Sequence, residues 1–432
     1  MRKLLLYSLG LICLWGLSSL TVSCDDVSYV DEREVNLVFS TDTLSFDTLF
    51  TTVGSTTRQV VVYNDSDKDL LLGSVTLTGG HASRFRLNVD GDTSMVARNV
   101  EIRSGDSIFI FVQANISPND ASSPFLVEDA IAFSNGQRLP LTAWGRNAVY
   151  HTVPEGAPYS VVDCEHWDHT RPHVIVGIAA VLDGHTLTLQ AGDELYFHDN
   201  GILAFDTNAR LVACGSVCQP VFFSSVRHDG WYDSIPGQWQ CLWFTGGSVG
   251  NVINHAVIEN GTGGLRVYPN ADLTVSNTVV RNMSDCALIG QGGSIRGSNL
   301  LVYDCLASLT VLRGGNYSFT GCTFADYWRY SARKIESVVL TNYLLNADGS
   351  VREAADLVRA DFTDCIVYGN YGGGEFLASQ IEGYLFNYRF DRCLVKGGEW
   401  DEDPMFENVD ADDYHLQEGS PAIGIGYRYD NE

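Results

Sequence analysis

The chain has 432 residues, with 53 acidic and 27 basic side chains and a formal net charge of -26. A surface of this charge repels phosphate backbones, so nucleic acid is excluded as an expected partner. Charged residues make up 19% of the chain and aromatic residues 11%, which is typical of a folded protein and not of a disordered one.

The N-terminus begins with two basic residues, continues with an apolar run over residues 4–22 and places the small Ser23 directly before Cys24. This order is that of a secretory signal over residues 1–23. The stretch resembles a bacterial lipoprotein signal, which implies that Cys24 is the lipid attachment site and that the membrane is reached through a lipid anchor. An uncleaved membrane helix and soluble secretion are the alternatives. The acidic residues that follow predict a tether over residues 24–35.

Residues 36–148 contain short alternating runs such as TRQVVVYN, RFRLNVDG and SIFIFVQANIS, separated by polar turns. This spacing predicts an antiparallel β-sandwich of roughly 100 residues. The order of the runs resembles the immunoglobulin-like domains that space or bind on bacterial surface proteins, so we assign the sandwich no catalytic role. Residues 149–173 are expected to form a linker.

An internal repeat of about 22 residues follows, with copies that begin at positions 251, 272, 294 and 316. In this frame three columns recur: Val257, Val279, Leu301 and Thr323; Ile258, Val280, Val302 and Phe324; Asn260, Asn282, Asp304 and Asp326. A repeat this short, rich in β-branched residues, predicts one coil of a parallel β-helix per copy over residues 174–398. The Asn and Asp column is expected at a turn, where the side chains stack as a ladder. The period breaks over residues 327–360, which predicts an excursion.

Nine cysteines remain when Cys24 and the cysteine of the signal are set aside, and an odd number excludes a complete disulfide framework. Three of them each follow a short strand start and are expected to stack as small apolar side chains inside the β-helix: Cys322, Cys365 and Cys393. Cys214 and Cys218 could form a bridge or bind a metal, but no His lies near them in the sequence. We predict no cofactor and no metal site.

Residues 399–432 contain DEDPMFENVDADDYHLQEGSPAIGIG, which resembles the closing segment of many bacterial β-helix surface proteins. Together with FSTDTLSFDTLFTTVGS, NVDGD, DSIFIFVQ, PGQW and CIVYGN, it makes residues 24–432 similar to a family of Bacteroidetes right-handed β-helix surface lipoproteins. The resemblance implies an all-β chain, in which an immunoglobulin-like β-sandwich precedes a right-handed parallel β-helix of the pectate-lyase-like fold. It also implies the outer membrane, with the protein exposed at the cell surface, but no mechanism.

Parallel β-helices that cleave polysaccharides use a calcium-held uronate with a basic residue, or two or three aspartates around a cleft. The corresponding motifs are missing, and RKIE at Arg333–Glu336 only faintly resembles the R-I-K of a galacturonase. We therefore predict no catalytic residue, and a β-helix that binds a glycan or a surface protein. A polysaccharide lyase or glycoside hydrolase on the same fold is the alternative.

Ligand binding is expected in the excursion, because loops that leave a rigid scaffold can vary without disturbing the core. There, aromatic and basic side chains that suit sugar rings or an acidic partner stand together: Tyr327, Trp328, Arg329, Arg333 and Lys334. Four sites resemble the Asp-Ser/Thr-apolar signal for O-glycosylation in this phylum: Thr43, Thr48, Ser107 and Ser234. Buried strand hydroxyls are the alternative explanation for those four.

Overall fold

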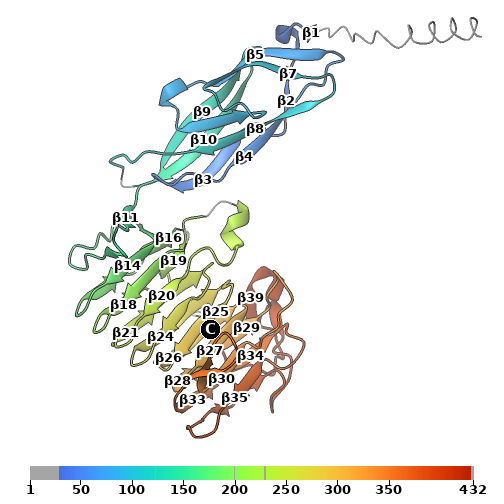
Figure 1. Cartoon of the computed structure of the whole chain (residues 1–432). Coiled ribbons are helices and arrows are strands. Elements are labelled where there is room, and N and C mark those ends of the chain that lie inside the picture. Colours follow the sequence, from blue (N-terminus) through green and yellow to red (C-terminus); the bar gives the residue numbers. More distant parts are fainter. Residues whose placement is uncertain (1–28, 122, 199, 228–229, 430–432) are drawn as a thin grey trace, which may run out of the picture. The chain divides into compact units, whose positions relative to one another are not determined.

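The computed structural model describes residues 29–121, 123–198, 200–227 and 230–429, so the signal and Cys24 lie outside the described residues. The chain divides into two compact units, which we describe separately (Figure 1). The first takes in the residues up to Phe46, Gly54–Asn115 and Leu126–Ala143, and the second takes in Asp47–Val53, Ile116–Phe125 and the chain from Trp144 onward. In the part of the chain that is described, no helix is long and apolar enough to span a membrane.

Two β-sheets build the sandwich of the first unit. One sheet has the order β1–β5–β9–β10–β3 with β7 also paired to β5, and the other has the order β2–β4–β8–β6. The strands are β1 (Tyr29–Val30), β2 (Val38–Phe39), β3 (Leu44–Phe50), β4 (Arg58–Tyr63), β5 (Asp69–Leu77), β6 (Phe85–Val89), β7 (Val96–Ile102), β8 (Ser107–Ala114), β9 (Phe125–Phe133) and β10 (Arg138–Arg146).

Ring contacts join the two sheets. Phe39 of β2 lies 5.2 Å from Phe133 of β9, and Phe46 of β3 lies 5.8 Å from Phe85 of β6, measured between ring centroids. Buried and solvent-facing residues alternate along β8, as a sheet with one face on a core requires. The strands thus form the predicted sandwich, and its immunoglobulin-like topology stays a prediction.

Three columns of parallel strands build the second unit, so the parallel β-helix is confirmed. Column 1 contains β11 (Val149–Thr152), β13 (His173–Val176), β16 (Glu194–Phe197), β19 (Val221–Ser225), β22 (Ala256–Glu259), the second halves of β24 (Asp272–Arg281) and β26 (Ser294–Tyr303), β29 (Thr323–Asp326), β34 (Ile366–Gly369) and β37 (Leu394–Val395). Column 2 contains β12 (Ser160–Val161), β14 (Ile178–Val181), β17 (Ile202–Phe205), β20 (Cys241–Phe244), β23 (Leu265–Val267), β25 (Cys286–Gln291), β27 (Ala307–Leu312), β30 (Val338–Thr341) and β35 (Phe376–Ser379). Column 3 contains β15 (Thr186–Leu189), β18 (Arg210–Cys214), β21 (Asn251–Asn254), the first halves of β24 and β26, β28 (Gly315–Thr320), β33 (Leu357–Thr363) and β36 (Arg389–Asp391).

Short elements complete the chain. They are the hairpins β31 (Tyr343–Leu345) with β32 (Val351–Ala354) and β38 (Phe406–Asn408) with β39 (Asp413–Leu416), and the 3-10 turns η1 (Glu32–Glu34), η2 (Gly80–Ala82), η3 (Gly230–Ser234) and η4 (Val409–Ala411). The C-terminal segment packs on the outside of column 1, where Phe406, Tyr414 and Ala422 share an apolar cluster with Leu301 and Ile366.

The register of the 22-residue repeat is the predicted one. Val257 pairs with Val279, Val279 with Leu301 and Leu301 with Thr323. The next position of the repeat, which Val280 occupies in β24, points inward, since Val280 is fully buried. The repeat could be found in the sequence because every coil must supply apolar residues at the same interior positions.

The predicted ladder at the turn is present between two of its four members, and a third member shares their backbone conformation. The Asn282 side-chain amide donates to Asn260 Oδ1 at 2.6 Å, and Asn260, Asn282 and Asp304 all have positive φ values of 51° to 64°. Asn and Asp tolerate this left-handed conformation better than other residues with a Cβ. The fourth member was predicted wrongly: Asp326 stays in β29, where it pairs with Gly369 and is buried.

Two predicted segments differ from the structure. Residues 149–173, expected as a linker, carry β11 and β12, which pair in parallel with β13 and β14, so the coils begin before residue 174. The excursion at 327–360 is shorter than expected, because β30 rejoins column 2 and β33 begins in column 3 at Leu357. The hairpin β31–β32 and the chain between β29 and β30 are what departs from the coil.

The cysteines follow the prediction of buried packing. Cys322, Cys365 and Cys393 directly precede β29, β34 and β37 of column 1, and all three are buried free thiols. Cys214 and Cys218 are exposed and unbridged. No group of three metal-ligating side chains occurs among the described residues.

Candidate functional site

Arg333, one of the predicted ligand residues, is buried inside the second unit. Its side chain is 1% exposed, and Nη1 donates to Glu375 Oε1 at 2.8 Å and to the Asp326 carbonyl at 2.9 Å. The Asp326 carboxylate accepts from the Ser308 and Ser337 hydroxyls at 2.9 and 2.6 Å. Burial raises the pKa of Asp326 to about 6, and the Arg333 charge opposes the rise. The expectation of a surface contact is corrected for Arg333, whose charge is held by these acids.

The other predicted ligand residues do not form one patch. Trp328 is 7% exposed and donates from Nε1 to Ser331 Oγ at 2.9 Å. Tyr327 is half-buried and packs against the C-terminal segment, whereas Lys334 is exposed. The aromatic side chains thus pack the base of the excursion, and the expected stack of aromatic and basic groups is not assembled.

Arg329 takes part in an ionic cluster under the C-terminal segment. Its Nη2 lies 2.5 Å from Asp304 Oδ2 and also donates to Asp412. Burial raises the pKa of Asp304 to about 7, while the Arg329 charge lowers it. On the neighbouring coils, Arg281 Nη2 lies 2.6 Å from Glu259 Oε2. Glu259, Asp304 and Asp412 therefore each lie against the guanidinium of Arg281 or Arg329.

A polar groove of about 840 Å³ lies over column 3. It lies on strands β21, β24, β26, β28 and β33, which are labelled in Figure 1. These strands are hydrogen-bonded neighbours in that order, about 4.8 Å apart. The base of the β31–β32 hairpin, at Ala355 and Asp356, lines one end. The groove is thus built on consecutive coils of the rigid part of the fold.

Outward side chains line the groove in two rows, because alternate residues of a strand face the same side. One row is Asp272, Ser294 and Asn316, and the other contains Thr274 and Arg296. Leu273 and Ile295, which lie between them in β24 and β26, point into the core. Each coil therefore presents hydroxyl, amide, carboxylate or guanidinium groups at equivalent positions.

Several of these groups have unused hydrogen-bonding capacity. Within the described part of the chain, the exposed side chains of Thr274, Arg296 and Asn316 make no hydrogen bond or ion pair. Asp272 Oδ1 accepts from the Gly250 amide at 2.8 Å, and Arg313 Nε lies 2.8 Å from Glu353 of β32. The groove thus offers free donors and acceptors beside paired charges.

Glycine keeps the turn beside the groove tight. Gly315 has a φ of 122°, and a Cβ at this position would lie 2.5 Å from the Gly293 carbonyl oxygen. Since real Cβ atoms do not approach so closely, a larger residue would push the coils apart. Both glycines line the groove.

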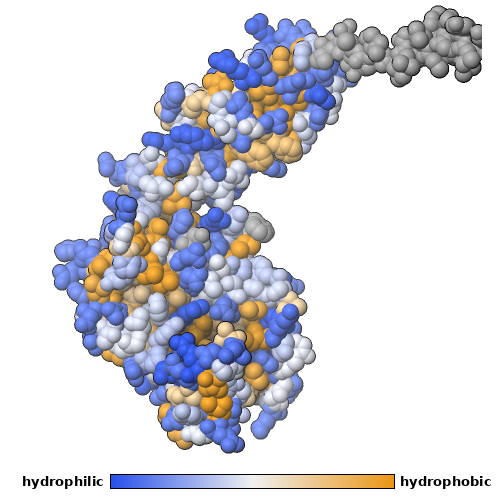
Figure 2. All heavy atoms as spheres, in the orientation of Figure 1, coloured by the Kyte–Doolittle hydropathy of each residue, from blue (hydrophilic) through white to orange (hydrophobic). Residues whose placement is uncertain are grey.

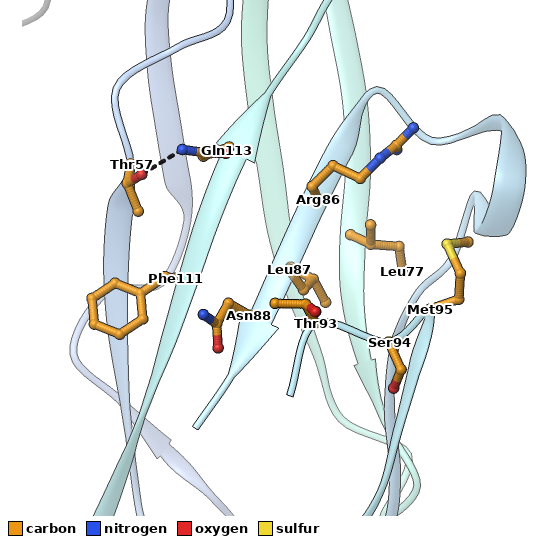
Figure 3. A pocket seen from close by; sticks show the side chains of 10 residues that line it. All are labelled: Thr57, Leu77, Arg86, Leu87, Asn88, Thr93, Ser94, Met95, Phe111 and Gln113. Atoms are coloured by element: carbon orange, nitrogen blue, oxygen red, sulfur yellow. Dashed lines mark hydrogen bonds between the residues drawn. The ribbon is translucent and has the colours of Figure 1, made fainter. Parts of the chain in front are cut away.

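The first unit has a hollow of its own, of about 380 Å³, beside β6 (Figure 3). Leu77, Leu87 and Phe111 line it with the Met95 side chain, and Thr57 accepts a hydrogen bond from Gln113 at 2.7 Å. Exposed apolar and aromatic side chains also lie on the outer face of β2, β4 and β8: Val38, Tyr63, Phe109 and Phe111. Figure 2 shows hydrophobic patches at the surface of this unit. Polar side chains line this hollow as well, among them Arg86, Asn88 and Ser94.

The four predicted O-glycosylation positions are accessible. Thr43 and Ser234 are exposed, and Thr48 and Ser107 are partly exposed. None of the four is a buried strand hydroxyl, so the alternative explanation does not apply, and modification stays a prediction. Lipidation at Cys24 lies outside the described residues.

The groove residues escaped the sequence analysis, although a signal was present. In the 22-residue frame, the first residues of successive copies are Asp272, Ser294 and Asn316, and the third residues include Thr274 and Arg296. Polar residues at both places mark an outer face.

Comparison with known proteins gives no family, since neither a family model nor a curated protein matches the chain. Among solved structures it is similar to the catalytic unit of a thermostable GH87 alpha-1,3-glucanase from Streptomyces thermodiastaticus strain HF3-3, with 12% identity over 78% of this chain and 79% of that chain and a TM-score of 0.22. It is also similar to the catalytic domain of a GH87 alpha-1,3-glucanase in complex with nigerose, with 10% identity over 79% of this chain and 78% of that chain and a TM-score of 0.18. At such TM-scores the similarity carries no argument about function.

Proposed function

We propose that the protein is a lipid-anchored glycan-binding protein of the outer membrane, displayed at the cell surface, and that its β-helix binds without cleaving. The observation that carries this proposal is the groove over column 3. Unpaired polar side chains on a rigid surface can hydrogen-bond sugar hydroxyls without first giving up a protein partner.

The state of the carboxylates favours binding over hydrolysis. Glycoside hydrolysis needs one carboxylic acid and one carboxylate on opposite sides of the scissile bond. Glu259 and Asp304 of column 1 are buried, and the guanidinium of Arg281 or Arg329 contacts each of Glu259, Asp304 and the nearby Asp412. In the groove, Asp272 accepts a backbone hydrogen bond and Asp356 Oδ1 accepts from the Leu385 amide at 2.8 Å.

The test is a glycan array probed with the purified mature chain, followed by titration of the glycans that bind. We expect Arg296→Ala to weaken binding by at least about tenfold, because the free guanidinium lies in the groove. Arg389→Ala is the matched control, since Arg389 is exposed on β36 of the same column but outside the groove. Equal binding by both variants would place the site elsewhere, and turnover of any polysaccharide would contradict the non-catalytic proposal.

The anchor is tested separately. We expect labelled fatty acid to enter the wild-type protein and not Cys24→Ala, which should accumulate as an unprocessed precursor. Label in the variant, or a soluble wild-type protein that begins at Asp25, would contradict the lipid anchor and leave the groove proposal untouched.

A further inference from the structure

We infer that the groove takes a linear, uncharged polysaccharide whose chain runs across the coils, parallel to the β-helix axis. This inference rests on the proposed function and names the class and the orientation of the ligand. It follows from the register of the groove, from its extent and from its charge.

The register gives the direction. Asp272, Ser294 and Asn316 stand at equivalent positions of three consecutive strands, and Thr274 and Arg296 repeat in the same way two residues further on. Neighbouring residues within a row are therefore about 4.8 Å apart along the axis, and the two rows are roughly 7 Å apart along each strand. The axial spacing is close to the length of one pyranose unit in an extended chain, so a polymer along the axis meets polar groups on three consecutive coils.

The extent of the groove sets the number of units. Its lining comes from five consecutive strands of column 3, namely β21, β24, β26, β28 and β33. Four steps between neighbouring strands amount to roughly 19 Å. A disaccharide covers one of these steps, whereas one unit on each of the five strands, about five units in all, covers all four.

The charge excludes a polyanion. Asp272 and Asp356 line the groove, the Arg313 charge is matched by Glu353, and the chain as a whole has a net charge of -26. Arg296 is the cation that is left, and one guanidinium does not balance a charge on every unit. Its several N–H donors suit hydroxyl and ring oxygens.

The experiment is a length series. Linear neutral oligosaccharides from disaccharide to octasaccharide, of the linkage that binds on the array, are titrated into the mature protein by calorimetry. We expect affinity to rise by at least about tenfold from the disaccharide to the pentasaccharide and then to level off, as contacts accumulate coil by coil. A charged series of the same lengths should bind more weakly.

Variants locate the ligand along the groove. Asn316→Ala should weaken the pentasaccharide roughly three- to tenfold through the loss of a hydrogen bond. Thr320→Ala, at an exposed position further along β28 and outside the groove, should not. If affinity were independent of length while Arg296→Ala still abolished binding, the axial polymer would be refuted and the glycan-binding proposal would stand. Tighter binding of the charged series would refute the neutral class, and an array without any bound glycan would contradict the proposed function itself.

Discussion

Strands β24 and β26 each serve two different surfaces of the β-helix. The first half of each strand carries Thr274 and Arg296 into the groove, and the second half carries Val279 and Leu301 beneath the C-terminal segment. The inward residues are alike in both halves, because all of them fill the same core. The outward residues alone differ, and they decide which face is covered by the chain and which is left open to a ligand.

The two halves are separated by a bend that the sequence encodes. Asn277 in β24 and Asn299 in β26 have φ values of 47° and 51°, and the Asn299 amide donates to Asn277 Oδ1 at 2.9 Å. The Asn277 amide donates in turn to Asn254 Oδ1 at 2.9 Å. This second ladder turns the strand so that its two halves face different ways.

The largest loss of stability is expected when a charge is placed at an inward position of β24, and an outward position of the same strand is the control. Val280→Asp buries an unpaired charge in the core and should lower the free energy of unfolding by at least about 4 kcal/mol. Thr274→Asp, at an exposed position of the same strand, should change it by no more than about 0.5 kcal/mol. Denaturant unfolding measures both, and similar losses in the two variants would show that the register of β24 is wrong.

Substitution of a buried and of an exposed arginine should affect stability differently. Arg333→Ala leaves Glu375 and Asp326 buried without their cation and should cost about 3 to 5 kcal/mol of stability. Arg296→Ala removes an unpaired groove side chain and should leave stability within about 0.5 kcal/mol. Thermal and denaturant unfolding of the two variants measure this, and an Arg333 variant as stable as the wild type would contradict the buried ion pair.

The repeat could be predicted from the sequence because it rests on local rules. Val257, Val279 and Leu301 recur at one period, and stacking coils must place them in register. Arg333 could not be assigned in this way, because its partner Glu375 lies 42 residues further along the chain. A basic residue in a loop looks like a surface residue until the fold brings an acid to it.

The groove was hidden for a related reason. The polar residues Asp272, Ser294 and Asn316 mark an outer face in the sequence. Val279 and Leu301 also point outward, but they are apolar because the C-terminal segment covers them. Which face stays open depends on where the C-terminal segment packs, and that is a property of the assembled fold. Sequence alone therefore gives the coils and their register, but not the surface that remains accessible.

The bend between the two halves should contribute a smaller amount. Asn277→Gly keeps the left-handed conformation but loses the ladder, which should cost about 1 kcal/mol. Asn277→Ala loses the ladder and must also adopt a positive φ, so it should be about 1 kcal/mol less stable than the glycine variant. Denaturant unfolding of both variants tests this order, and an alanine variant more stable than the glycine variant would contradict the strained bend.

The last prediction concerns the ionisation of the covered face. Burial raises the pKa of Asp304 to about 7, so the folded protein holds a proton there that the unfolded chain releases near pH 4. The stability contributed by this proton is complete below about pH 4 and is lost as the pH rises towards about 7. Asp304→Asn imitates the protonated acid, so its stability relative to the wild type should increase with pH, by at most about 1.4 kcal/mol per pH unit. Denaturant unfolding of both proteins from about pH 5 to about pH 8 measures this difference. A difference that does not change with pH would mean that Arg329 keeps Asp304 ionised throughout, and that the charge pairs of the covered face outweigh its burial.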